Sequence, residues 1–219
     1  MTQLLKLKII LGIIYVLIVT IVTFLFFYYE IYNYVNSDFI KYDRKIILNY
    51  INQNIFLYSF LFFLFSAIWF FLLGFGFPLV IVAGFIFGSG LGSVLLLIGF
   101  VIGSTALYVF ANYYFKDLVF KYFSNKYKSL NDHFKSNETA YLLFFRLQPG
   151  IPSQVGSLIP ILFNIKVKKI FFSNIFGVAP GIFISVSLVS GISSKIEEGS
   201  QLNLDLLSDP KISIPLAAL

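Results

Sequence analysis

The sequence has very little charge. Asp, Glu, Lys and Arg make up 12% of its 219 residues, against roughly 25% in an ordinary soluble domain. The 70 positions from Ile46 to Phe115 contain no charged residue, and the mean hydropathy of the chain is +0.88. A soluble fold of this length needs a polar surface, which so few charges cannot supply. These absences predict an integral membrane protein.

Other absences narrow the chemistry. The chain has no Cys, which excludes disulfides, thiolate metal sites and a cysteine nucleophile, and its single His is His133 in a polar stretch. The apolar segments hold no Asp or Glu, so neither a buried hydrolytic centre nor a metal site is expected. We therefore predict no enzyme and no cofactor. The net charge of +6 is assigned to basic loops beside the membrane rather than to nucleic-acid binding.

Four apolar segments are long enough to cross a bilayer, which takes about 20 residues. They are residues 7–29, 55–73, 91–115 and 170–189. The N-terminal part, residues 1–54, is predicted as one transmembrane helix and an aromatic interfacial segment. A cleavable signal peptide is the alternative for the helix, but its length and the lack of a small-residue cleavage site favour an uncleaved span. An extramembrane helix is the alternative for the interfacial segment.

Two further apolar segments, about residues 74–90 and 139–164, are interrupted by glycine or proline. Neither is suited to crossing the bilayer, and broken backbone is tolerated at membrane depth only inside protein or beside a wet cavity. We predict that both are re-entrant helical hairpins, with a kinked helix as the alternative for the first. Each hairpin precedes a span, which gives two similar units, residues 74–115 and 139–189, within a predicted membrane domain of residues 55–192.

The remaining segments are more polar. Residues 116–138 carry aromatic residues at a spacing of three and four, which predicts an amphipathic surface helix, with an irregular loop as the alternative. The tail, residues 193–219, is polar up to Asp209 and apolar after Ile212. Either a short segment covers the fold there, or a further helix begins.

Arg146 is the one ionised side chain within the deep apolar pattern. An arginine at the middle of a membrane helix costs roughly 2.5–3.5 kcal/mol on insertion scales, so it should face a partner, a cavity or a ligand. Guanidinium is a planar fork of donors suited to phosphate or carboxylate. An anionic ligand or the carbonyl groups of the turn at residues 149–152 are the expected acceptors. Snorkelling of Arg146 to the interface is an alternative of equal weight.

Two motifs resemble a known family. They are Phe145-Arg146-Leu147-Gln148-Pro149-Gly150-Ile151-Pro152 and Gly177-Val178-Ala179-Pro180-Gly181, and they are similar to the signature of the DedA-like, VTT-domain (SNARE-associated Golgi protein-like) membrane proteins. Pro78, the run from Ala83 to Gly88, and the glycines at positions 92, 99 and 103 resemble the first half of that family. The resemblance implies an all-α polytopic fold, inverted-repeat-like, whose two re-entrant hairpins face each other from opposite sides. It also implies movement of phospholipid or polyprenyl phosphate between bilayer leaflets.

The chain also departs from the family pattern. Ser157 stands where the family often has Asn, and Asn112 replaces the Arg that often ends the span of the first repeat. The first hairpin has no acidic residue, whereas the DedA branch usually has one. The missing acid favours the VTT side of the family and argues against proton coupling through a hairpin carboxylate.

Lipid translocation in the cell membrane (the inner membrane of a Gram-negative cell) is therefore the predicted function, with membrane lipids and no nucleic acid as partners. The predicted substrate-binding residues are Arg146, Gln148, Pro149, Pro152, Ser153, Gln154 and Ser157. The residues predicted to shape the hairpins and pack the helices are Pro78, Gly84, Phe87, Gly88, Gly99, Gly103, Gly177, Pro180 and Gly181. A small-solute transporter and a structural or assembly membrane protein are the alternatives, and self-association into a homo-oligomer stays open.

Overall fold

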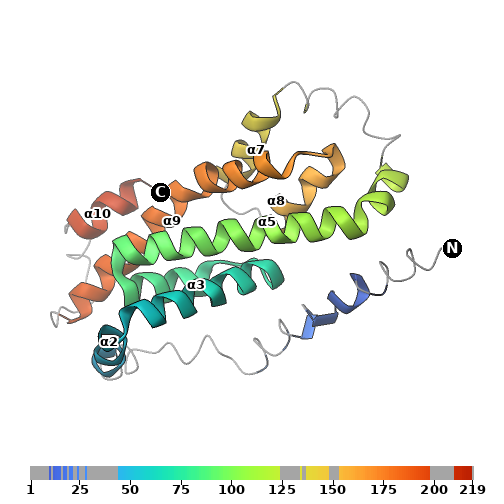
Figure 1. Cartoon of the computed structure of the whole chain (residues 1–219). Helices are drawn as coiled ribbons and strands as arrows, with labels where there is room; N and C mark the ends of the chain where they lie inside the picture. The colour runs from blue at the N-terminus through green and yellow to red at the C-terminus, as the bar shows by residue number, and fades with distance from the viewer. Residues whose placement is uncertain are drawn as a thin grey trace. The chain divides into compact units, whose positions relative to one another are not determined.

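The structure is a computed structural model that describes residues 44–123, 134, 137–147, 153–197 and 210–218, together with scattered residues between 10 and 28 (Figure 1). The described part contains helices and no strands. The elements are α2 (Arg44–Gln53), α3 (Ile55–Leu72), α4 (Phe77–Val82), the π-helical η3 (Ala83–Phe87), α5 (Gly88–Phe123), α7 (Glu138–Leu147), α8 (Ser153–Leu158), the 3₁₀-helical η4 (Ile159–Phe163), α9 (Val167–Glu197) and α10 (Pro210–Ala217). The predicted all-α fold is confirmed.

Three stretches of the described chain are long and apolar enough to cross a membrane. They are Ile55–Leu72, Phe77–Lys116 and Val167–Lys195, and they cover the last three predicted spans except for Leu73. Large apolar side chains project from these helices, as Phe56 on α3 and Phe176 on α9 do with 89% and 66% of their surface exposed. Such surfaces are tolerated where lipid covers them. The described residues within the first predicted span, residues 7–29, are helical.

The stretch Phe77–Lys116 reverses direction at Gly88. This residue has φ +74° and ψ −179°, a conformation open essentially to glycine alone. A Cβ built on Gly92 would clash with the carbonyl oxygen of Ala83, although residues nine apart in a straight helix are separated by about 13.5 Å. The segment α4–η3 therefore folds back on the start of α5 and forms a first helical hairpin. That this hairpin is re-entrant in the bilayer stays a prediction.

The second hairpin consists of α7 and the pair α8–η4. The guanidinium of Arg146 contacts Ser157, eleven residues further along the chain, which requires α8 to fold back on α7 because a straight helix would separate them by about 16 Å. At the other end of the hairpin the ring of Phe134 stacks on that of Phe163 with 3.9 Å between centroids. The turn, residues 148–152, lies outside the described residues.

The structure corrects one expectation and describes two further segments. The surface helix predicted from residue 116 is wrong at its start, because α5 continues to Phe123; no glycine or proline interrupts residues 104–123. Residues 124–133 of that prediction lie outside the described part.

Helix α9 continues through Pro180 without ending. The C-terminal segment α10 packs on α9, with Ile212 buried and the carbonyl oxygen of Lys211 2.7 Å from the Cβ position of Gly191.

The chain divides into two compact units. Unit 1 comprises residues 1–25, 67–75 and 100–178 and holds the second hairpin; unit 2 comprises residues 26–66, 76–99 and 179–219 and holds the first. Unit 1 has a buried core of Tyr108, Ala111, Phe134, Leu142, Ile161, Phe163, Ile165 and Ile170. This core joins α5 and α9 to the second hairpin, and the functional residues singled out below belong to the same unit.

Candidate functional site

Arg146 lies in the last turn of α7 in unit 1 and is half-buried. Its Nη2 donates a hydrogen bond to Oγ of Ser157 on α8 at 3.0 Å, and its Cζ lies 5.5 Å from the ring centroid of Phe100 on α5. Ser157 is fully buried and Phe100 is 4% exposed. A hydroxyl and an aromatic face hold a guanidinium in place without neutralising its charge.

Two glycines leave room for the Arg146 side chain between α7, α8 and α9. A Cβ on Gly177 of α9 would lie 2.5 Å from the Cβ of Arg146, and a Cβ on Gly156 of α8 would lie 3.0 Å from its Nη1. Both distances are shorter than ordinary contacts between carbon and its neighbours. The absence of side chains at these two positions therefore lets α7 approach α8 and α9 closely, with the arginine between them.

The other predicted binding residues are placed as follows. The side-chain amide of Gln154 lies against Gly74, which has φ +73° and follows α3. Ser153 is the first residue of α8. Gln148, Pro149 and Pro152 lie outside the described residues. Of the predicted set, the structure brings Arg146 and Ser157 together, while Gln154 meets the connection after α3.

The predicted packing residues are distributed over both units. In unit 2, Pro78 is in the first turn of α4, Phe87 lies 5.0 Å from the ring of Phe62, and a Cβ on Gly84 would lie 2.7 Å from the carbonyl oxygen of Val186. In unit 1, a Cβ on Gly103 would clash with the carbonyl oxygen of Ala67.

Each long helix carries two of these glycines four residues apart, Gly99 and Gly103 in α5 and Gly177 and Gly181 in α9, and the two pairs differ in their surroundings. Gly99 is buried within α5, and its pair partner Gly103 lies against α3. Of the pair in α9, by contrast, only Gly177 has a close neighbour: a Cβ on Gly181 would meet nothing within 4 Å among the described residues.

Sequence reasoning missed a buried polar cluster centred on Asn174 of α9, which is 0% exposed. Its Nδ2 donates to Oγ of Ser104 at 2.8 Å and to Oγ1 of Thr105 at 3.1 Å, both on α5. The hydroxyl of Ser104 in turn donates to the carbonyl oxygen of Phe100 at 2.7 Å, one turn away in the helix. An asparagine inside a predicted span was the available signal. Its partners are 69 and 70 residues away in the chain and could not be identified from the sequence.

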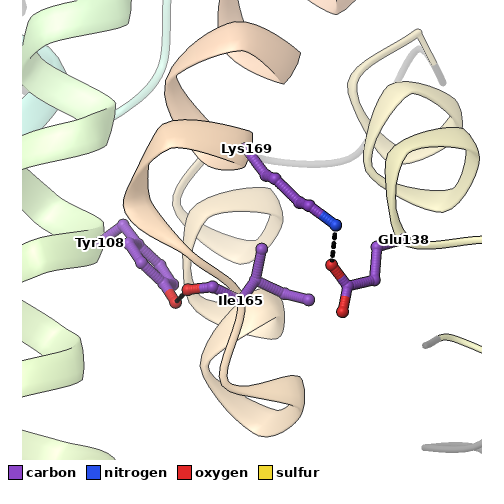
Figure 2. Close-up of polar contacts among 4 residues, drawn as sticks. All are labelled: Tyr108, Glu138, Ile165 and Lys169. Atoms are coloured by element: carbon purple, nitrogen blue, oxygen red, sulfur yellow. Dashed lines mark hydrogen bonds and ion pairs between the residues drawn. The ribbon is translucent and has the colours of Figure 1, made fainter.

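Polar contacts continue beyond this cluster toward the far end of unit 1. The hydroxyl of Tyr108 donates to the carbonyl oxygen of Ile165, and Nζ of Lys169 on α9 pairs with Oε2 of Glu138 on α7 at 2.6 Å (Figure 2). The ion pair is partly exposed, as expected of charges near the end of a membrane helix. It ties the start of α7 to the start of α9.

The helical hairpins, the apolar helices and a guanidinium held inside the apolar part together define a polytopic α-helical membrane protein. The model of the VTT domain matches residues 75–191, more than half of the chain. The chain belongs to the VTT-domain family, which confirms the resemblance drawn from its motifs. No solved structure matches the chain significantly.

Proposed function

We propose that this protein moves lipids between the leaflets of the cell membrane and that Arg146 binds the phosphate of the lipid headgroup. The proposal depends on one observation: the guanidinium of Arg146 lies between the arms of a helical hairpin, against a hydroxyl and an aromatic ring. Membership of the VTT-domain family supports it, since lipid movement is what the motif resemblance implies. Phospholipids and polyprenyl phosphates both carry a phosphate group.

The chemistry of Arg146 suits a phosphate group as its ligand. Guanidinium offers five donors in a fixed fork, which matches two oxygens of a phosphate at once. Hydrogen bonds between ionised partners are roughly twice as strong as neutral ones, and more so away from bulk water. Ser157 and Phe100 contact the guanidinium without supplying a competing negative charge. They therefore help to orient the guanidinium of Arg146.

Lipid movement by the purified full-length protein in liposomes tests the proposal. A fluorescent phospholipid and a dithionite quench report how much lipid crosses the bilayer. Arg146→Ala is expected to reduce the rate by at least about tenfold, the factor for one charge-assisted hydrogen bond of about 1.5 kcal/mol or more. Arg146→Lys should retain part of the activity, because it keeps the charge and loses the fork.

Lys168→Ala is the matched control, because Lys168 is an exposed cation in the first turn of α9. Its removal changes net charge by the same amount and should leave the rate unchanged. Equal rates for the wild type and Arg146→Ala would refute the role of Arg146. A wild-type protein that moves no lipid but takes up a small solute would favour the transporter alternative.

A further inference from the structure

The backbone that follows α3 in unit 1, residues 73–75, is held by hydrogen bonds to one tryptophan. We call these residues the α3 turn. The amide nitrogens of Leu73 and Gly74 both donate to the carbonyl oxygen of Trp69, at 2.7 and 3.2 Å. The indole nitrogen of Trp69 in turn donates to the carbonyl oxygen of Phe75 at 2.7 Å. Gly74 is buried within this turn.

The side chain of Gln154 on α8 covers the α3 turn at Gly74. A Cβ built on Gly74 would clash with Cδ of Gln154 and would lie 2.5 Å from its Oε1 and 2.6 Å from its Nε2. Because the whole amide group is this close, it occupies the space where a side chain at position 74 would begin. The φ of +73° at this position also favours glycine. The contact therefore depends on Gln154 and Gly74 as a pair.

This contact completes a closed cycle of contacts around Arg146 within unit 1. Near the end of α3, the ring of Phe70 meets the ring of Phe100 on α5 with 4.8 Å between centroids. The guanidinium of Arg146 lies over Phe100 and donates to Ser157 on α8. Ser157 and Gln154 are three residues apart in that helix, so they are neighbours on one side of it. Gln154 then leads back to the α3 turn.

The end of α3 is itself anchored in unit 1. The hydroxyl of Tyr15 donates to the carbonyl oxygen of Phe71 at 2.7 Å, and the ring of Phe71 meets that of Phe110 on α5 with 5.7 Å between centroids. The α3 turn is therefore a fixed support for α8. Where Gln154 contacts this support determines where α8 places Ser157.

We propose that Gln154 is a positioning residue, whose contact with Gly74 fixes α8 and, through Ser157, the direction of the guanidinium of Arg146. The inference rests on the proposed function, which makes a phosphate the ligand of Arg146. It gives Gln154 a role other than the headgroup contact predicted from the sequence. A guanidinium matches two phosphate oxygens only in the plane of its fork, and a site held about 1 Å too loosely loses much of its function.

Lipid movement by variants of Gln154 distinguishes positioning from direct binding. Gln154→Ala should slow lipid movement about fivefold, because α8 loses its support. Gln154→Met should keep at least about half of the wild-type rate, since its flexible side chain fills a similar space over Gly74. Val155→Ala is the matched control, a neighbour on α8 that is 43% exposed, and it should leave the rate unchanged. If Gln154→Met is as slow as Gln154→Ala, the amide itself contacts the lipid and the positioning role is overturned.

The Arg146→Lys background separates positioning from general damage to the fold. This variant keeps the positive charge but has no fork to orient. Gln154→Ala should therefore slow it by less than about twofold, against about fivefold in the wild type. A loss of equal size in both backgrounds would mean that Gln154 acts independently of Arg146, which would refute the proposal.

Trp69 gives a readout that needs no lipid movement. It is the single tryptophan of the sequence, and its indole nitrogen is bonded to Phe75 of the α3 turn. In the full-length protein in detergent, Gln154→Ala should shift the tryptophan emission to longer wavelength, because a loosened turn lets water reach the indole. Gln154→Met and Val155→Ala should keep the wild-type spectrum. An unchanged spectrum in Gln154→Ala would overturn the contact as a support.

Binding of a short-chain phospholipid, measured by calorimetry, separates this inference from the proposed function. The affinity should weaken about fivefold in Gln154→Ala and stay the same in Val155→Ala. This result in a protein that moves no lipid would refute the function and leave the positioning role standing. A wild type whose lipid movement depends on Arg146, with Gln154→Ala equal to it in rate and affinity, would refute the positioning role and leave the function standing.

Discussion

The two hairpins of this protein are held together by different contacts. The first, in unit 2, turns at one glycine with φ +74°, and its arm approaches α9 through Gly84 with a gap that leaves no room for a side chain. Its segment, residues 77–99, contains no charged residue. The second, in unit 1, is closed by a stacked aromatic pair and by the hydrogen bond of Arg146 to Ser157.

The difference suggests that the first hairpin serves the packing of the fold and that the second carries the chemistry. Backbone packing between glycines gives van der Waals contact and close helix approach, which suits a membrane interior where no hydrophobic force drives helices together. An ionised side chain in the same surroundings is costly and is retained where it serves a function. We therefore expect mutations in the first hairpin to act on folding, and mutations around Arg146 to act on activity.

Gly88→Val should have the largest effect on stability. The φ and ψ of Gly88 fall in a region that is essentially restricted to glycine, and forcing a β-branched residue into it costs on the order of 1–3 kcal/mol. The unfolding temperature in detergent, followed by circular dichroism, should fall clearly.

Gly90→Ala is the control for that change. It lies two residues further along α5, and a Cβ there meets nothing within 4 Å of the described residues. Alanine is favoured over glycine in a helix by about 1 kcal/mol, so the control should be neutral or slightly more stable. A Gly88 variant as stable as this control would show that the first hairpin does not depend on its glycine turn.

Gly177→Ala should combine a loss of stability with a loss of activity. Its Cβ would lie 2.5 Å from the Cβ of Arg146, so α7 and α9 must move apart; overpacking of this kind costs typically 1–3 kcal/mol. Lipid movement and the melting temperature are both measured. Gly181→Ala, whose Cβ would meet nothing within 4 Å among the described residues, should keep the wild-type rate, with a melting temperature that is unchanged or slightly higher. A Gly177 variant with the wild-type rate would show that Arg146 tolerates displacement.

Phe100→Leu should have the smallest effect on lipid movement. It gives the most direct comparison between the two hairpins. The cation–π contact of Phe100 with Arg146 contributes about 0.5–1 kcal/mol, so the rate of lipid movement should fall about two- to fivefold. Phe62→Leu is the matched variant, because Phe62 is a buried ring that packs on Phe87 of the first hairpin. Both changes should lower the melting temperature similarly. If Phe62→Leu slows lipid movement as much as Phe100→Leu, the division of labour between the hairpins is wrong.

Much of the fold was predictable because its signals are local. Runs of about 20 apolar residues identify membrane helices, and the glycines and prolines that interrupt the other two segments marked where the chain folds back. The end of α5 was missed by eight residues, since a polar stretch after an aromatic belt does not stop a helix when no breaker is present. Membership of the VTT-domain family was also predictable, from Arg146 and the prolines and glycines around it.

The neighbours of Arg146 were not predictable in the same way. Ser157 was singled out because it follows the turn in the chain, whereas Phe100 is one of 28 phenylalanines with no mark that distinguishes it. Asn174 and its partner Ser104 lie in different helices, 70 residues apart. In a soluble protein the apolar face of a helix indicates its core side; here lipid and core both accept apolar residues, and the pattern loses that information.

The sequence by itself determined that this chain is a membrane protein and at which residues its apolar segments are interrupted. It also determined that Arg146 is the one ionised side chain within the deep apolar pattern. These follow from composition and from the length of each segment, which need no knowledge of contacts. Only the tertiary structure decided that Arg146 lies against Phe100, Ser157 and Gly177. The helical period fixes which residues share a ridge, but the close approach of helices selects which ridge meets the arginine, and that approach depends on glycine contacts between distant segments.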